Sequence, residues 1–212
     1  MKLLAIIALT LSLSACGVAQ KAQYSALEKF GIHKRDVLVD RIEKTTKSQE
    51  ATKEQFQSAY EELASLVTID DQGLEKKYKK MAASVDKSES RAAELKSRIA
   101  SVDQVANDLF AEWEEELNQY ESANLKAASQ KNLNTTKQRY AAIYQKMQES
   151  SAKVDPVLRV LQDNTLYLKH NLNARSVSGL SSEVLVIENQ VRTLIAQMEA
   201  SINESKTFIN SL

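Results

Sequence analysis

The sequence has very few of the residues that make turns. Glycine occurs four times and proline once among 212 residues, against average usage of about 7% and about 5%. Because each pair of strands in a sheet needs a turn, this scarcity argues against a fold of many short strands. We therefore expect an all-α protein with long helices and few connections.

An excess of charge of one sign is also missing. Lysine and arginine together number 28, as do aspartate and glutamate, so the formal net charge at pH 7 is zero. Proteins that bind nucleic acids place clustered cations against the phosphates. The sequence has no such basic stripe, and we expect no nucleic-acid partner.

Cysteine occurs once, at Cys16, which leaves no second thiol for a disulfide within the chain. An apolar run from Leu3 to Leu13 precedes it, behind one positive charge at Lys2. This pattern is typical of a secretory signal peptide. The run is too short to span a bilayer, which takes about 20 apolar residues.

The stretch Leu13-Ser14-Ala15-Cys16 resembles the lipobox of bacterial lipoproteins. The resemblance implies removal of residues 1–15 and a thioether from Cys16 to a diacylglycerol, so that acyl chains such as palmitate hold the mature protein to a membrane. Gly17, where inner-membrane lipoproteins carry aspartate, implies the periplasmic face of the outer membrane. The alternative is a plain secreted protein with a buried or free thiol.

Four stretches carry seam residues at alternating spacings of four and three, the heptad pattern of helices that pack on one another. They run from Leu38 to Leu66, from Leu74 to Trp113, from Tyr140 to Leu172 and from Val184 to Leu212. The last shifts by one position after Met198. With short connections, neighbouring helices are antiparallel. The seams therefore predict an elongated antiparallel coiled coil of four long helices over residues 34–212.

Pro156 lies inside the third seam, where a proline either kinks a helix or separates two helices. The seam keeps its phase from Val154 to Leu158, and this continuity favours one helix kinked at Pro156.

The outer two helices are predicted to be shorter than the central two, so residues 108–138 of the central pair should project alone as an arm. Its turn is expected between Tyr120 and Gln130. Trp113, Leu117 and Tyr120 are candidate partner-binding residues there, because aromatic side chains often anchor interfaces. Alternatively, Trp113 packs at the junction where the four-helix part ends.

Residues 16–33 form a lipidated linker in this interpretation. Its stretch KAQYSALEKF, residues 21–30, has the pattern of a short helix with Tyr24, Leu27 and Phe30 on one side. Three roles are open for this segment: packing against the base of the arm, lying at the membrane surface, or serving as a tether.

Polar residues occupy some seam positions, namely Thr45, Gln49, Thr52 and Ser88. Counting from the turn sets Thr52 level with Ser88. A polar layer of this kind fixes the register of packed helices. The alternative is a cavity for an apolar or lipid ligand.

The residues needed for catalysis or metal binding do not cluster in the sequence. His33 and His170 belong at opposite ends of the predicted helices, so they cannot share a metal ion. With one cysteine assigned to lipid, nucleophilic triads have few candidates. We expect no enzymatic activity, no cofactor and no metal.

Two longer stretches carry a likeness to a known family: FGIHKRDVLVDRIEKTTKSQEATKEQF and DPVLRVLQDNTLYLKHNLNARSVSGLSSEV. Through the strings GIHKRD and LKHNLNA, the chain resembles an uncharacterised family of Gram-negative lipoproteins, a domain of unknown function predicted to be coiled coil. The resemblance implies a lipoprotein and a helical fold, and supplies no activity.

The expected function is therefore that of a membrane-anchored periplasmic scaffold or adaptor of the cell envelope. The expected partner is another envelope protein or a second copy of the chain. The alternative is a helical module that binds a lipid or an unfolded client, as a chaperone does.

Overall fold

The computed structural model describes residues 33–67, 73–173, 176–177 and 179–212. The predicted signal peptide, Cys16 and the segment 21–30 lie outside these ranges. The described residues form long helices without a strand, which confirms the all-α prediction. The elements are α2 (Lys34–Val67), α3 (Leu74–Glu116), the short 3-10 helix η1 (Leu117–Gln119), α4 (Ala123–Ala152), α5 (Val154–His170) and α7 (Ser181–Ile209).

The helices α2 and α3 are antiparallel neighbours. At one end of α2, Lys34 forms an ion pair with Glu112 near the end of α3. Further along α2, Gln55 Nε2 donates to Ser84 Oγ at 2.9 Å, near the start of α3. The residue numbers of the partners on α3 therefore decrease as the residue numbers on α2 increase, which is the pattern of an antiparallel pair. The two helices follow each other closely in the chain and make a hairpin.

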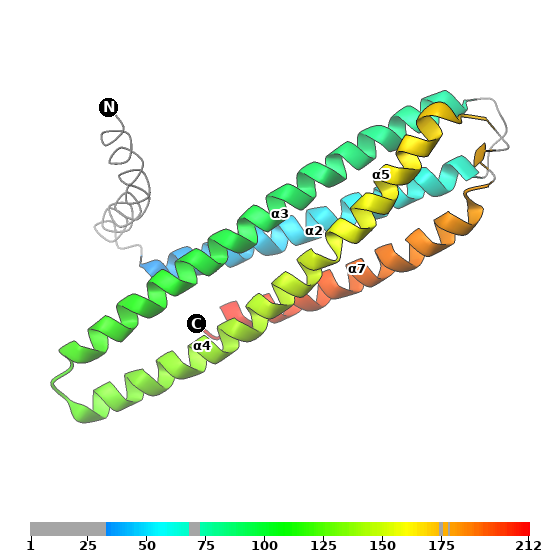
Figure 1. The fold of residues 1–212 in the computed structure, drawn as a ribbon. Coiled ribbons are helices and arrows are strands. Elements are labelled where there is room, and N and C mark those ends of the chain that lie inside the picture. The colour runs from blue at the N-terminus through cyan, green and yellow to red at the C-terminus, as the bar shows by residue number, and fades with distance from the viewer. Residues whose placement is uncertain (1–32, 68–72, 174–175, 178) are drawn as a thin grey trace, which may run out of the picture.

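The remaining helices continue this antiparallel order. Lys96 on α3 pairs with Asp155 on α5 at 2.7 Å, and Lys53 on α2 pairs with Glu199 on α7 at 3.2 Å. The α4–α5 rod returns along α3, and α7 then returns along α5 and α4. Figure 1 shows the four rods side by side along one long axis, with the α3–α4 hairpin reaching furthest at one end.

A single residue, Lys153, separates α4 from α5. Its φ of −81° and ψ of −14° remain in the right-handed helical region, and its N–H donates to the carbonyl of Ser150 at 3.3 Å. Pro156 sits in the first turn of α5, where its missing N–H costs least. The geometry lies between the two alternatives, because the helix is interrupted while the rod continues.

The core follows the predicted seams with local changes of phase. Every position of the first seam, from Leu38 to Leu66, is buried. On α3 the seam was expected to continue through Leu109 to Trp113, but both are half-buried and Phe110 is buried. On α4 the expected Ser151 is half-buried and its neighbour Ser150 is buried. These changes widen the buried stripe, as expected for helices that contact two neighbours instead of one.

On α7 the predicted phase shift corresponds to two adjacent stripes. The main seam continues without a shift through Met198, Ser201, Ser205 and Phe208, all buried. Ile202, which is also buried, and half-buried Ile209 belong to a second stripe on the side of α7 that faces α2. The helix is therefore apolar over a wider face than a single heptad seam requires.

The α3–α4 hairpin extends past both outer helices (Figure 1). Because Lys34 pairs with Glu112 and Phe208 of α7 packs on Tyr140, the uncovered part begins near Trp113. The connection between the two arms of the hairpin is at residues 120–122. This is a shorter arm than the 108–138 expected, because α2 and α7 reach slightly further along the central pair.

The start of α2 is closed by a reciprocal hydrogen bond. The N–H of His33 donates to Asp36 Oδ2 at 3.1 Å, and the N–H of Asp36 donates to the carbonyl of His33 at 2.9 Å. The Asp36 carboxylate thus supplies the N3 half of a capping box, in which the side chain of the fourth residue accepts from the first N–H. The hydrogen bond from His33 lowers the pKa of the Asp36 carboxyl below its ordinary value. The string GIHKRD thus contains the signal that begins α2.

Candidate functional site

Two of the three candidate partner-binding residues pack inside the projecting hairpin. Trp113 is half-buried, and its Nε1 donates to Ser129 Oγ on α4 at 2.8 Å. Leu117 is buried, and with Leu133 it forms the apolar interior of the hairpin. Tyr120 is 41% exposed at the connection. Of the three, Tyr120 is therefore the residue that presents most of its surface to solvent.

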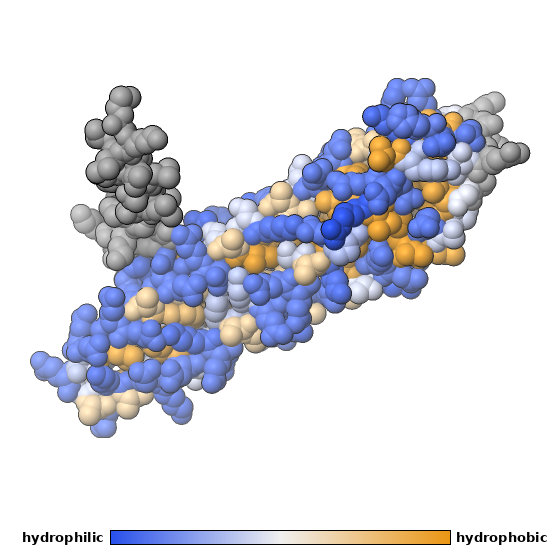
Figure 2. All heavy atoms as spheres, in the orientation of Figure 1, coloured by the Kyte–Doolittle hydropathy of each residue, from blue (hydrophilic) through white to orange (hydrophobic). Residues whose placement is uncertain are grey.

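A second apolar side chain lies beside the connection. Leu125, in the first turn of α4, is 60% exposed, and its N–H donates to the capping oxygen of Ser122 at 3.4 Å. Most other residues of the tip are hydrophilic, as Figure 2 shows for the face in view. Tyr120 and Leu125 are the two large apolar side chains exposed at this end of the described hairpin, and we refer to them as the tip spot. A small apolar centre with a polar rim is the usual anatomy of a contact surface.

The base of the hairpin is held by aromatic side chains from three helices. The ring of Tyr140 packs edge-on against Phe110, with 5.5 Å between centroids, and lies 6.3 Å from Phe208 of α7. Its hydroxyl donates to Asp103 Oδ1 at 3.1 Å. Burial, with the nearby Asp103 carboxylate, raises the pKa of Tyr140 above its ordinary value. The aromatic base joins the hairpin to α7.

The polar seam residues form a layer near the middle of the bundle. Gln49 is completely buried, and its Nε2 donates to Ser150 Oγ on α4 at 3.0 Å and to Ser201 Oγ on α7 at 2.9 Å. One side chain of α2 thus bonds to two other helices. Its Oε1 is buried with no hydrogen-bond partner, so the layer carries a cost in stability.

The other polar residues of this layer bond within their own helices. Thr52 Oγ1 donates to the carbonyl of Ser48 at 2.7 Å, and Ser88 Oγ donates to the carbonyl of Ser84 at 2.9 Å. Because Gln55 lies opposite Ser84, Thr52 lies near the level of Ser88, as the count from the turn indicated. Gln49 is therefore the residue through which the layer connects different helices.

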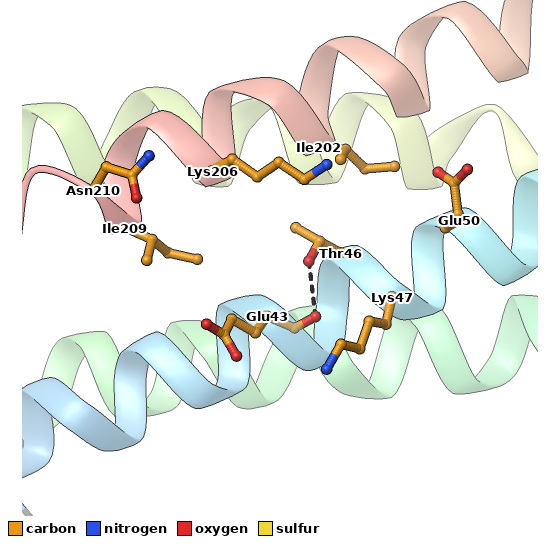
Figure 3. A pocket seen from close by; sticks show the side chains of 8 residues that line it. All are labelled: Glu43, Thr46, Lys47, Glu50, Ile202, Lys206, Ile209 and Asn210. Atoms are coloured by element: carbon orange, nitrogen blue, oxygen red, sulfur yellow. Dashed lines mark hydrogen bonds between the residues drawn. The ribbon is translucent and has the colours of Figure 1, made fainter.

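A surface groove of about 710 Å³ runs between α2 and α7 beside this layer. The α2 wall is polar and consists of Glu43, Thr46, Lys47 and Glu50. The α7 wall consists of Ile202, Lys206, Ile209 and Asn210. Figure 3 shows Ile202 and Ile209 directed into the space between the two helices. We refer to this site as the α2–α7 groove.

Ion pairs of Lys53 lie at one end of the α2–α7 groove. Lys53 Nζ lies 2.8 Å from Glu50 and 3.2 Å from Glu199, and so links α2 to α7. The hydrogen bond to Glu50 raises the pKa of Lys53 above its ordinary value. The other end opens toward the start of α2 and the last residues of the chain, where Asn210 forms part of the wall.

The two histidines lie far apart and at the surface. His33 is exposed just before α2, and His170 is exposed at the last position of α5. Their helix ends lie at opposite ends of the bundle in Figure 1. In the part of the chain that the structure describes, no three His, Cys, Asp or Glu side chains are grouped as metal ligands. The described helices also lack a stretch with the length and apolarity needed for a membrane crossing.

Comparison with known families decides the relationship of the chain. Residues 23–212 match the family described as Protein of unknown function (DUF2959). The chain belongs to this family. No curated protein matches it, and no solved structure does. The DUF2959 match covers every described helix and begins at residue 23, within the predicted linker.

Sequence reasoning missed the α2–α7 groove, although the chain contains a signal for it. Ile195, Ile202 and Ile209 recur at intervals of seven beside the main seam of α7, which indicates a second apolar stripe. These residues were interpreted in the sequence as a phase shift of a single seam, and the second stripe was therefore not recognised. Exposed apolar residues at the other end of the molecule were also not predicted; they are Leu166, Tyr167, Leu185 and Val186.

Proposed function

We propose that this member of the DUF2959 family is a lipid-anchored lipoprotein of the bacterial outer membrane, facing the periplasm, and that it acts as a scaffold or adaptor. The lipid is attached at Cys16, and the helical bundle carries the contact surface. The proposal assigns no catalytic step. The partner is another protein of the envelope.

The observation that supports this function best is the projecting α3–α4 hairpin. Its interior is closed by Leu117 and Leu133, and its base is held by the aromatic contacts of Tyr140. A hairpin that packs well without neighbours holds its tip in a defined position. That rigidity lowers the entropic cost of binding a partner through the tip.

The tip spot has the chemistry of a modest protein contact. Tyr120 and Leu125 supply apolar area, and the charged residues Glu121 and Lys126, both exposed, are their neighbours in the chain. Such a surface suits a small interface that is polar at its rim. An aromatic anchor at the centre of an interface often carries a large share of the binding energy.

In-cell photo-crosslinking tests the adaptor role. A benzophenone side chain at position 120 should give a discrete adduct with one envelope protein, which mass spectrometry would identify. Position 87 serves as the matched control, because Lys87 is exposed on α3 within the four-helix part. The same adducts from both positions, or none from position 120, would contradict an interaction through the tip.

The anchor is tested separately. Cells grown with a labelled fatty acid should incorporate the label into the wild-type chain, and Cys16→Ala should abolish incorporation and release the protein from the membrane fraction. A labelled or membrane-bound Cys16→Ala variant would contradict lipidation at this residue. The two experiments are independent, so the adaptor role and the anchor succeed or fail separately.

A further inference from the structure

The two helices of the α3–α4 hairpin carry charges of opposite sign toward its tip. Residues 99–121, the end of α3 with the connection, contain seven aspartate and glutamate residues and no lysine or arginine. Residues 122–148, most of α4, contain five lysine and arginine residues and no acidic residue. On the other described helices the two signs are mixed. We refer to the two stretches as the acidic arm and the basic arm.

Many of these charges have no partner within the hairpin. An ion pair from Lys137 to Glu114 joins the two arms at 2.6 Å. Six further charged residues are exposed, three on each arm: Glu115, Glu116 and Glu121, and Lys126, Lys131 and Arg139. Within the described part of the chain, none of these six forms an ion pair. Attraction between the arms of one hairpin therefore does not account for them, and they are available to another molecule.

The signs separate where the other helices leave the hairpin uncovered. Lys34 at the start of α2 pairs with Glu112, so the acidic residues that follow Glu112 lie past this end of α2. Phe208 near the end of α7 packs on Tyr140, so the basic residues that precede Tyr140 lie past this end of α7. Figure 1 shows the hairpin reaching beyond both outer helices. A second molecule can therefore approach both arms.

We propose that the hairpin pairs with the hairpin of a second copy of the chain, side by side and with both tips at the same end. The acidic arm of each copy then lies against the basic arm of the other. Two-fold symmetry forms both contacts at once, because each copy presents the same two arms. The inference concerns a contact between copies along the arms, and it is independent of a partner at the tip spot.

The positions of the charges along the hairpin fit this arrangement. The hydrogen bond from Trp113 to Ser129 shows where the two arms are level. Counting from this pair along the antiparallel arms sets Lys126 level with Glu116, and Lys131 about one helical turn from Glu115. Side chains on a helix lean toward its N-terminus, which brings the last two charges closer together. With the two-fold axis parallel to the hairpins, the same levels hold between the copies.

The presence of both signs favours a second copy over other occupants. An anionic membrane surface or a nucleic acid attracts the basic arm, but it repels the acidic arm beside it. A molecule that satisfies both arms needs a basic and an acidic strip side by side, and a second hairpin presents this pair. Complementary charge also fixes the orientation, because like arms placed opposite each other repel.

Photo-crosslinking from the acidic arm tests the proposal. A benzophenone side chain replaces Ala111, which is exposed and lies near the level of Lys131, so that every charge is kept. After irradiation of cells that express the full-length chain, we expect an adduct of two chains. Peptide mass spectrometry should map it to residues 122–139 of the second chain. An adduct with another envelope protein, an adduct on lipid, an adduct only within one chain, or no adduct would overturn the proposal.

Charge reversal tests which arms meet. Glu115→Lys with Glu116→Lys reverses two charges on the acidic arm, and Lys126→Glu with Lys131→Glu reverses two on the basic arm. Each variant alone should lower the yield of the two-chain adduct roughly tenfold, because like charges then face each other. Co-expression of the two variants with different tags should restore the yield as adducts between them. A chain that carries all four reversals should again pair with itself.

A matched control connects the effect to the hairpin. Glu54 and Asp86 are exposed acidic residues within the four-helix part, and Glu54→Lys with Asp86→Lys should leave the yield unchanged. Circular dichroism shows whether each variant keeps its helix content. Folded variants of either arm that keep the wild-type yield would overturn the pairing of unlike arms. The same conclusion would follow if neither co-expression nor the fourfold reversal restored the yield.

Discussion

Gln49 and Ser201 are 152 residues apart in the chain and are joined by a buried hydrogen bond of 2.9 Å. The same Nε2 also donates to Ser150, so one amide group links the first, third and fourth rods of the bundle. Apolar seams tolerate sliding, because one leucine can replace another along the stripe. A buried amide with two acceptors restricts the helices to the few alignments that set a hydroxyl opposite it.

Substitutions at Gln49 separate its packing role from its polar role. Gln49→Ala removes the hydrogen bonds and leaves a cavity, and should lower the free energy of unfolding by about 2–4 kcal/mol. Gln49→Leu fills the space and removes Oε1, which has no partner. It should therefore remain within about 1 kcal/mol of the wild type. Urea denaturation measures both values.

The register role of Gln49 has its own readout. Without the amide, Gln49→Leu should populate more than one helix alignment, seen as additional amide signals in nuclear magnetic resonance spectra. A Gln49→Leu variant with a single set of signals would contradict the register role. If it lost as much stability as Gln49→Ala, the hydrogen bonds and not the packing would dominate.

The raised pKa of Tyr140 predicts that the folded protein loses stability in alkali. The folded state raises the pKa of its phenol, so the folded protein keeps this proton at a pH where the unfolded chain releases it. The resulting stabilisation is complete below the unfolded pKa of about 10 and is lost as the pH rises above it. Tyr140→Phe should cost about 1 kcal/mol at neutral pH, through loss of the bond to Asp103. It should also flatten the decline above pH 10 in denaturation curves. Equal slopes for the two proteins would refute this assignment.

Trp113 should control the stability of the hairpin more than that of the whole bundle. Trp113→Ala removes its contacts and the bond to Ser129, and should lower the local free energy of opening by about 2–4 kcal/mol. Hydrogen exchange should then accelerate in residues 113–137 and stay unchanged in the middle of α2. Trp113→Phe keeps most of the packing and loses only the hydrogen bond, so it should lower the local free energy of opening by about 1 kcal/mol. Uniformly faster exchange along the chain would indicate that the hairpin does not open separately.

A pair of leucines tests the assignment of the core. Leu95 is fully buried on α3 and Leu185 is 62% exposed on α7. Leu95→Ala should lower the free energy of unfolding by about 2–5 kcal/mol, and Leu185→Ala should change it by about 0.5 kcal/mol or less. Thermal and urea denaturation provide the comparison. Similar losses at the two positions would mean that the end of α7 is covered by another part of the chain or by a second molecule.

The heptad pattern predicted the helices well, because long regular helices bury residues at regular intervals. The first seam is correct at every position, including polar Thr45, Gln49 and Thr52, since α2 follows one alignment over 34 residues. The pattern was less accurate for α4 and α5. Their seam broadens around the interruption at Lys153, and Ser150 becomes buried where Ser151 was expected.

The candidate sites were harder to predict than the helices. Spacing places Gln49 on a seam, but it does not state which helices meet there, so its bonds to Ser150 and Ser201 required the three-dimensional arrangement. Similarly, Leu117 lies on the predicted arm, yet it is buried, because a two-helix hairpin still has one interior stripe. Tyr120 escapes this stripe because the helix ends before it.

The aromatic base of the hairpin also fixes the position of α7 along the bundle axis. Ser201 and Ser205 are both buried and lie one turn apart, so sliding α7 by one turn, about 5.4 Å, would still set a hydroxyl opposite Gln49. The same slide would carry Phe208 away from Tyr140, where its ring now lies 6.3 Å from centroid to centroid. Polar bonding thus restricts α7 to positions one turn apart, and the aromatic contact selects one of them.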